Sequence, residues 1–138
     1  MTWIIRSASS SDEDSVVRLW GQCGLTTDYN DPFVDFRFAC EGAASTVLVA
    51  LEGERVVGSV MVGHDGHRGW IYYLAAEPER QNRGIGSGLM TAAEDWLRKR
   101  RVPKLHLMVR ESNAQVTGFY ERLGFELMPR IAMAKWLA

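Results

Sequence analysis

The residues from Gln81 to Gly88 combine glycines with basic and amide side chains, where an apolar strand pattern gives way to an amphipathic helix. Glycines at positions 84, 86 and 88 allow the backbone to approach a ligand closely. A helix that begins near Ile85 directs its first N–H groups and the positive end of its dipole at any anion there. The spacing therefore predicts a loop that binds a pyrophosphate.

Two common phosphate-binding fingerprints do not fit this loop. A Rossmann fingerprint requires Gly or Ala at a third glycine position, where this chain has Leu89. A Walker loop requires Gly-Lys-Ser/Thr, and none follows these glycines. The pattern Q/R-x-x-G-x-G/A does fit, with Gln81, Gly84 and Gly86. In this pattern the chain resembles the GNAT superfamily of acetyl-CoA-dependent N-acetyltransferases.

A second segment extends the resemblance. The stretch from Asn113 to Phe125, which contains Tyr120 and a Leu-Gly-Phe turn, is similar to the closing motif of that family. The resemblance implies an α/β GNAT fold, with a mixed, mostly antiparallel sheet of about six or seven strands and about four helices on both faces. Asn30-Asp31-Pro32 and the segment 65–69 further resemble a subgroup of small bacterial proteins of the YpeA type.

The composition limits the class of protein. A chain of 138 residues suffices for one core, so we expect a single domain over residues 1–138. A formal net charge of −1 without a basic stripe argues against a nucleic-acid partner. The sequence has neither a signal peptide nor an uncharged apolar run of about 18 residues, so we expect a cytoplasmic protein without membrane association. A homodimer stays open, with Trp136 as a candidate interface residue.

Local patterns predict the order of the elements. Ser10-x-x-Glu13 is a capping box that opens the first helix, and the turn Glu52-Gly53-Glu54 joins two strands. The expected strands cover residues 3–8, 46–51, 56–63, 70–76, 104–110 and 131–137. The helices after the first are expected at 33–41, 85–100 and 114–123.

The family resemblance implies which residues bind acetyl-CoA. The loop amides would hold the pyrophosphate, Arg80 or Arg83 would meet the adenosine-side phosphate, and the fourth strand would pair with the pantetheine arm. Asn113 would bond the arm, or alternatively cap a helix. The expected cofactor-binding residues are Leu74, Ala75, Ala76, Gln81, Asn82, Arg83, Gly84, Ile85, Gly86, Ser87, Gly88, Asn113 and Tyr120.

Two residues are expected to carry the acid–base chemistry. Tyr120 would protonate the departing thiolate, since a phenol with a pKa of about 10 is protonated at neutral pH. Its alternative is a packing role, because it shares helical spacing with Val116 and Leu123. Glu77 is the candidate general base. Its alternative is a solvated loop residue, because it directly precedes a proline. A backbone N–H near Ala76 is the expected oxyanion donor.

The residues expected to bind the acceptor are Asp31, His67, Arg68 and Tyr72. Asp31 would belong to an acidic rim that favours a cationic amine, or serve as a turn and cap residue. Either His67 would act as a base or Arg68 would clamp a carboxylate of the acceptor. Tyr72 and Tyr73 alternate along a strand, so their hydroxyls are expected on opposite faces. No metal site is expected, because the histidines near residue 65 have no third ligand in the sequence.

These residues predict an N-acetyltransferase that transfers the acetyl group of acetyl-CoA directly to a primary amine in a ternary complex. The acceptor is either a small molecule or a protein. The alternative is a non-catalytic acyl-CoA-binding sensor or interaction module, which the lack of an unambiguous base favours. A nucleotide-binding domain is a third option, disfavoured because the two fingerprints do not fit.

Overall fold

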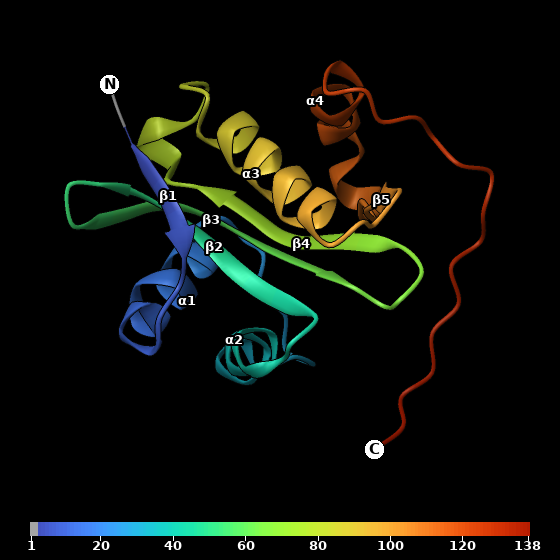
Figure 1. The fold of residues 1–138 in the computed structure, drawn as a ribbon, viewed down its shortest axis with the longest axis horizontal. Helices are drawn as coiled ribbons and strands as arrows, with labels where there is room; N and C mark the ends of the chain where they lie inside the picture. The colour runs from blue at the N-terminus through green and yellow to red at the C-terminus, as the bar shows by residue number, and fades with distance from the viewer. Residues whose placement is uncertain (1–2) are drawn as a thin grey trace. The chain divides into compact units, whose positions relative to one another are not determined.

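The computed structural model describes residues 3–138. The chain forms two compact units, Met1–Met108 and Val109–Ala138. The first unit contains the sheet and the helices α1 to α3, and the second contains α4 (Figure 1). The elements of the first unit are β1 (Ile4–Ser7), η1 (Ser10–Asp12), α1 (Glu13–Gln22), α2 (Pro32–Glu41), β2 (Ser45–Glu52), β3 (Arg55–His64), β4 (Gly69–Ala76), η2 (Pro78–Arg80), α3 (Ile85–Lys99) and β5 (Leu105–His106), with η marking 3-10 helices.

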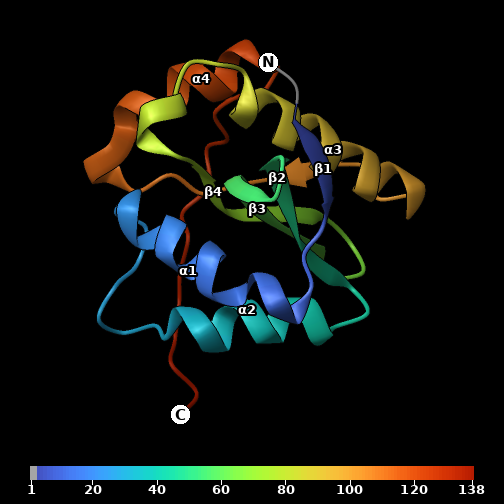
Figure 2. The ribbon, with the colours of Figure 1, turned by 90° about the vertical axis from the view of Figure 1, so that its left-hand side faces the viewer.

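The strands form one sheet in the order β1-β2-β3-β4-β5. Strands β1 to β4 pair antiparallel, whereas β5 runs parallel to β4. Helices α1 and α2 cover one face of the sheet and α3 covers the other (Figures 1 and 2). The expected mixed, mostly antiparallel sheet with helices on both faces is therefore confirmed.

Each face of the sheet packs against apolar helix surface. On the face covered by α1 and α2, Trp20 and Phe36 belong to one buried cluster with Val47. On the other face, α3 lies close to β3 because Gly58 has no side chain: a Cβ there would lie 2.5 Å from the Ile85 side chain. Since Ile85 is the first residue of α3, this contact fixes where the helix begins.

The capping box at the first helix lies one residue earlier than predicted. The amide of Ser9 donates to the Asp12 carboxylate at 2.8 Å, so the box uses Ser9 and Asp12 in place of Ser10 and Glu13. The side chain of Arg6 holds the Asp12 carboxylate at 2.7 Å, which favours this register. Glu13 instead pairs with Arg37 of α2 at 2.6 Å.

Strand β4 contains a β-bulge. Met61 of β3 pairs with Tyr72 of β4, and Ser59 pairs with Ala75. Tyr73 and Leu74 therefore lie opposite a single β3 residue, the one between Ser59 and Met61. Tyr73 has a φ of 53°, in the left-handed region that bulky residues avoid.

The bulge overturns the prediction that Tyr72 and Tyr73 point to opposite faces. Met61 and Tyr73 both pack against the α1–α2 cluster, and Tyr72 shares a face with Met61 because paired residues lie on the same side of a sheet. Both tyrosines therefore lie on the face covered by α1 and α2.

The second unit contains η3 (Glu111–Val116) and α4 (Thr117–Arg122). The predicted helix over 114–123 therefore begins as a 3-10 helix. The predicted strand over 131–137 is wrong, and that over 104–110 shortens to Leu105–His106, which gives five strands in place of six or seven in the described residues. Apolar alternation alone does not make a strand, because the backbone also needs a pairing partner.

Candidate functional site

The outer edge of β4 is open along most of its length. Its parallel pairing with β5 covers only Gly69 and Trp70. Beyond Trp70, no strand in the described part of the chain pairs with this edge, which runs through Leu74 and Ala75 to Ala76. An open edge of this kind can pair with an extended ligand through backbone hydrogen bonds. The three residues predicted to bind the pantetheine arm therefore lie on a strand edge suited to that role.

The glycine-rich loop leads from β4 into α3. Gly84 is the N-cap of α3, with a φ of 86°, and Asn82 also has a positive φ of 67°. The first turn closes with a 2.9 Å hydrogen bond from the Gly88 amide to the Gly84 carbonyl. The amides of Ile85 to Ser87 therefore have no acceptor within the helix and point out of its N-terminus. The residues whose amides are predicted to hold the pyrophosphate, Arg83 to Gly88, lie at the end of the loop and in the first turn of α3.

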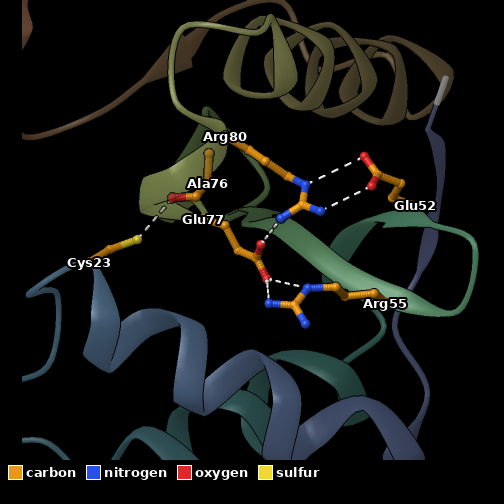
Figure 3. Close-up of polar contacts among 6 residues, drawn as sticks. All are labelled: Cys23, Glu52, Arg55, Ala76, Glu77 and Arg80. Atoms are coloured by element: carbon orange, nitrogen blue, oxygen red, sulfur yellow. Dashed lines mark hydrogen bonds and ion pairs between the residues drawn. The ribbon is translucent and has the colours of Figure 1, made fainter. Parts of the chain in front are cut away.

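Glu77, the predicted base, lies between two arginines (Figure 3). Its side chain is buried, with one carboxylate oxygen 2.7 Å from Arg55 and the other paired with Arg80. Arg80 in turn reaches Glu52 at 3.0 Å. Guanidinium groups occupy both oxygens of this carboxylate, so the contacts weigh against a base role for Glu77. The guanidinium of Arg80, predicted with Arg83 as an alternative partner of the adenosine-side phosphate, is paired with Glu52 and Glu77.

The four predicted acceptor residues belong to three elements: the α2 N-cap, the turn before β4, and β4. The Asp31 carboxylate accepts hydrogen bonds from the amides of Phe33 and Val34, so Asp31 caps α2. His67 and Arg68 lie in the turn before β4, where both amides donate to Asp65. Because β4 has eight residues, this turn is roughly 23 Å from the Ala76 end of the strand.

Tyr72 lies between these two ends of β4. Its side chain is 44% exposed, and partial burial with the nearby Asp65 charge raises its pKa. Tyr72 is therefore accessible on the α1–α2 face, and the nearby Asp65 belongs to the turn that contains His67 and Arg68.

Sequence reasoning missed the contacts around Tyr73. Its ring stacks on Trp20 with centroids 3.9 Å apart, and its hydroxyl donates to Asp35 of α2 at 2.7 Å. The Trp20 indole donates to Ser59 at 2.9 Å. These contacts hold the strained bulge residue in place. The sequence shows the adjacent tyrosines, but it does not indicate that one of them has a positive φ.

Cys23 is a second missed contact. It lies near the end of α1, where its thiol donates to the Ala76 carbonyl at 3.2 Å (Figure 3). Burial raises the pKa of this thiol, and the nearby Glu77 charge acts in the same direction. A protonated thiol can donate this hydrogen bond, so Cys23 links α1 to the end of β4.

In the second unit, Tyr120 is half-buried between Phe119 and Phe125, with ring centroids 5.1 and 5.7 Å away. Burial raises the pKa of Tyr120, which keeps its hydroxyl protonated at neutral pH. Asn113 accepts a 2.6 Å hydrogen bond from Gln115. Asn113 lies at a kink within η3, with a φ of −120°, and the N-caps of η3 and α4 are Arg110 and Val116. Its contact with the cofactor arm stays a prediction.

Residues 3–138 contain neither a metal-binding cluster nor a membrane-spanning helix. No three His, Cys, Asp or Glu side chains lie where they would hold a metal ion. None of the helices has the length and apolar character to cross a membrane.

Comparison with known proteins connects these features to a family. The sequence model of the acetyltransferase (GNAT) family matches residues 12–125. An acetyltransferase of Pectobacterium atrosepticum is 41% identical over 133 residues, which cover 96% of this chain and 94% of that relative.

Solved structures agree in fold. A predicted acetyltransferase of Clostridium acetobutylicum, solved with acetyl-CoA, has a TM-score of 0.79 at 16% identity, with 97% of this chain and 96% of that one covered. An aminoglycoside acetyltransferase from an uncultured soil sample, in complex with sisomicin, has a TM-score of 0.80 at 16% identity, with coverages of 99% and 96%. On the strength of the family model and the bacterial relative, this chain belongs to the GNAT family of acetyltransferases.

Proposed function

We propose that this acetyltransferase moves the acetyl group from acetyl-CoA directly to a primary amine within a ternary complex. The observation that carries the proposal is the open edge of β4, followed after η2 and the glycine-rich loop by the α3 N-terminus with Gly84 at its cap. The edge from Leu74 to Ala76 would pair with the pantetheine arm, and the amides of Ile85 to Ser87 would bind the pyrophosphate. Arg83, exposed in the same loop, would meet the adenosine-side phosphate.

The chemistry would proceed without a covalent enzyme intermediate. The neutral amine attacks the thioester carbonyl carbon, the tetrahedral oxyanion forms, and the C–S bond breaks as the thiolate leaves. Tyr120 donates its proton to that thiolate, and its raised pKa keeps the hydroxyl protonated until the transfer. Glu77 as the base that takes the amine proton stays a prediction. Because both of its oxygens are paired, we favour loss of that proton to water.

The acceptor is a primary amine of a small molecule or of a protein. Folds of this type occur in an aminoglycoside acetyltransferase solved with sisomicin and in a glucosamine-6-phosphate N-acetyltransferase of Arabidopsis thaliana, whose name specifies transfer to nitrogen. Of the predicted acceptor residues, Tyr72 is the best placed, because it is exposed on the face where Tyr73 meets Asp35. Asp31, His67 and Arg68 are better explained by the turns and caps they form.

Several broader expectations accompany this proposal. The family match runs from residue 12 to residue 125, which supports one catalytic domain over both units. The support for the YpeA-type subgroup and for a cytoplasmic location is the bacterial origin of the similar acetyltransferase. A homodimer is supported by large apolar side chains in the C-terminal segment, where Ile131, Met133 and Leu137 are each more than nine-tenths exposed.

Calorimetric titration with acetyl-CoA, CoA, ATP and NAD tests the cofactor. We expect both CoA species to bind and both nucleotides to fail. A panel of amines with a thiol-release assay then tests the acceptor. CoA binding with no acetylated amine in the panel, and only slow hydrolysis of acetyl-CoA, would favour the sensor alternative. Binding of ATP or NAD without CoA would reject the proposal.

A further inference from the structure

The ion pairs around Arg80 are arranged as a chain of charges. Glu52 at the end of β2, Arg80 in η2, Glu77 after β4 and Arg55 at the start of β3 alternate in sign (Figure 3). We propose that these residues are a positioning network for the phosphate loop, so that carboxylates that never touch the cofactor set the affinity for CoA. This inference rests on the proposed function only in that the loop binds CoA.

The network connects two segments that are distant in sequence. Glu52 and Arg55 flank the turn of the β2–β3 hairpin, whereas Glu77 and Arg80 flank the turn that enters the loop. Backbone bonds join the same segments, since the Glu77 amide donates to the Val57 carbonyl at 2.9 Å. The hairpin therefore acts as a fixed support to which the beginning of the loop is attached.

The centre of the network is shielded from water, whereas its two ends, Arg55 and Glu52, have side chains 62% and 34% exposed. The Glu77 side chain is 6% exposed and that of Arg80 is 21% exposed, so neither can exchange its partner freely for water. Two carboxylates balance two guanidinium groups. Removing one carboxylate leaves a partly buried arginine without its full compensation, and the side chain must move to regain it. Because Arg80 directly precedes Gln81, such a movement displaces the start of the loop.

A competing account makes Arg80 a direct ligand of a phosphate. The two accounts differ in sign for Glu52→Gln. Arg80 and Arg83 both lower the pKa of Glu52, so this carboxylate is ionised and close to the cations of the loop. Electrostatics alone predicts that removing this negative charge frees Arg80 and tightens CoA binding. A positioning network predicts weaker binding, because the loop loses its attachment to the hairpin.

The experiment compares wild type, Glu52→Gln, Glu52→Asp and a control, Glu13→Gln. The control removes the same charge from a two-oxygen ion pair with Arg37, between α1 and α2. Two quantities are measured: amide hydrogen exchange over residues 81–88 in the free protein, and the Kd for CoA by calorimetry. For Glu52→Gln we expect faster exchange in the loop and a Kd at least about fivefold higher, with a smaller change for Glu52→Asp and none for Glu13→Gln.

The two readouts separate the network from the function. Unchanged loop exchange, or a Kd for Glu52→Gln equal to or below that of wild type, overturns the network. A wild type that does not bind CoA refutes the proposed function instead, and the exchange comparison then decides the network by itself. Kinetics add a further check, since a network that acts on CoA affinity raises KM for acetyl-CoA and leaves kcat nearly unchanged.

Discussion

Gly84 offers a direct test of whether the backbone of the loop binds the anion. A Cβ at position 84 would meet only the Trp3 ring, at 4.0 Å, so Gly84→Ala creates no clash. The cost is conformational, because Gly84 has a φ of 86°. An L-residue in this region is less stable by about 1–2 kcal/mol. The variant should therefore lose roughly that much stability, or relax its φ in the free protein.

Relaxation would turn the same energy into a loss of affinity. If CoA must restore the positive φ to reach the amides of α3, binding bears the cost of about 1–2 kcal/mol, and the Kd rises roughly 5- to 30-fold. Gly66→Ala is the matched control. Gly66 has a φ of 83° and open space around it, but it lies in the turn at the other end of β4.

Chemical denaturation and calorimetric titration with CoA measure the two effects. Gly66→Ala is expected to lose stability while keeping its Kd. If Gly84→Ala also kept its Kd, whether or not it lost stability, the argument that the left-handed cap shapes an anion site would be refuted.

Three further predictions follow from the geometry. Tyr120→Phe should lower kcat by roughly 10²-fold with little change in the Kd for CoA, and unaltered turnover of an identified amine would exclude the acid role. Arg101, at the C-terminal end of α3, has a φ of 61°, so Arg101→Gly should raise the unfolding free energy by about 1 kcal/mol in urea titrations, and a loss would contradict this. The Arg6 hydrogen bond lowers the pKa of Asp12 in the folded state, so the Asp12 carboxylate stabilises the fold. Asp12→Asn should therefore be less stable than wild type. This difference should be fully present above the unfolded pKa of about 3.9 and should disappear as the pH falls through the lower folded pKa. Urea titrations of both proteins at about pH 7 and about pH 3 test this, and a pH-independent difference would be the contrary result.

Short-range signals carried most of the successful predictions. The glycines around Ile85, the turn at Gly53 and the apolar period of α3 each act within a few residues, so a sequence displays them directly. The helix–strand order and the start of α3 could be predicted for that reason.

Contacts between distant segments could not be predicted. Glu77 reads as a solvated residue before a proline, because nothing near it in sequence indicates that Arg55 lies beside it in space. The bulge at Tyr73 depends on the register between β3 and β4, which strand alternation does not encode. The segment over 131–137 has the alternation of a strand, but pairing is decided by a partner that the segment itself does not specify.

The bulge divides β4 into two reading frames. Before Tyr73, odd-numbered residues such as Gly69 face α3, as its close approach to Leu97 requires. After it, the even-numbered Ala76 shares the α3 face with its partner Gly58, and the odd-numbered Ala75 joins the α1–α2 core. Deleting one residue at the bulge would therefore move every side chain in the second half of the strand to the opposite face, including those of Ala75 and Ala76. A point substitution changes one side chain of this edge, whereas a change of frame would exchange its two faces.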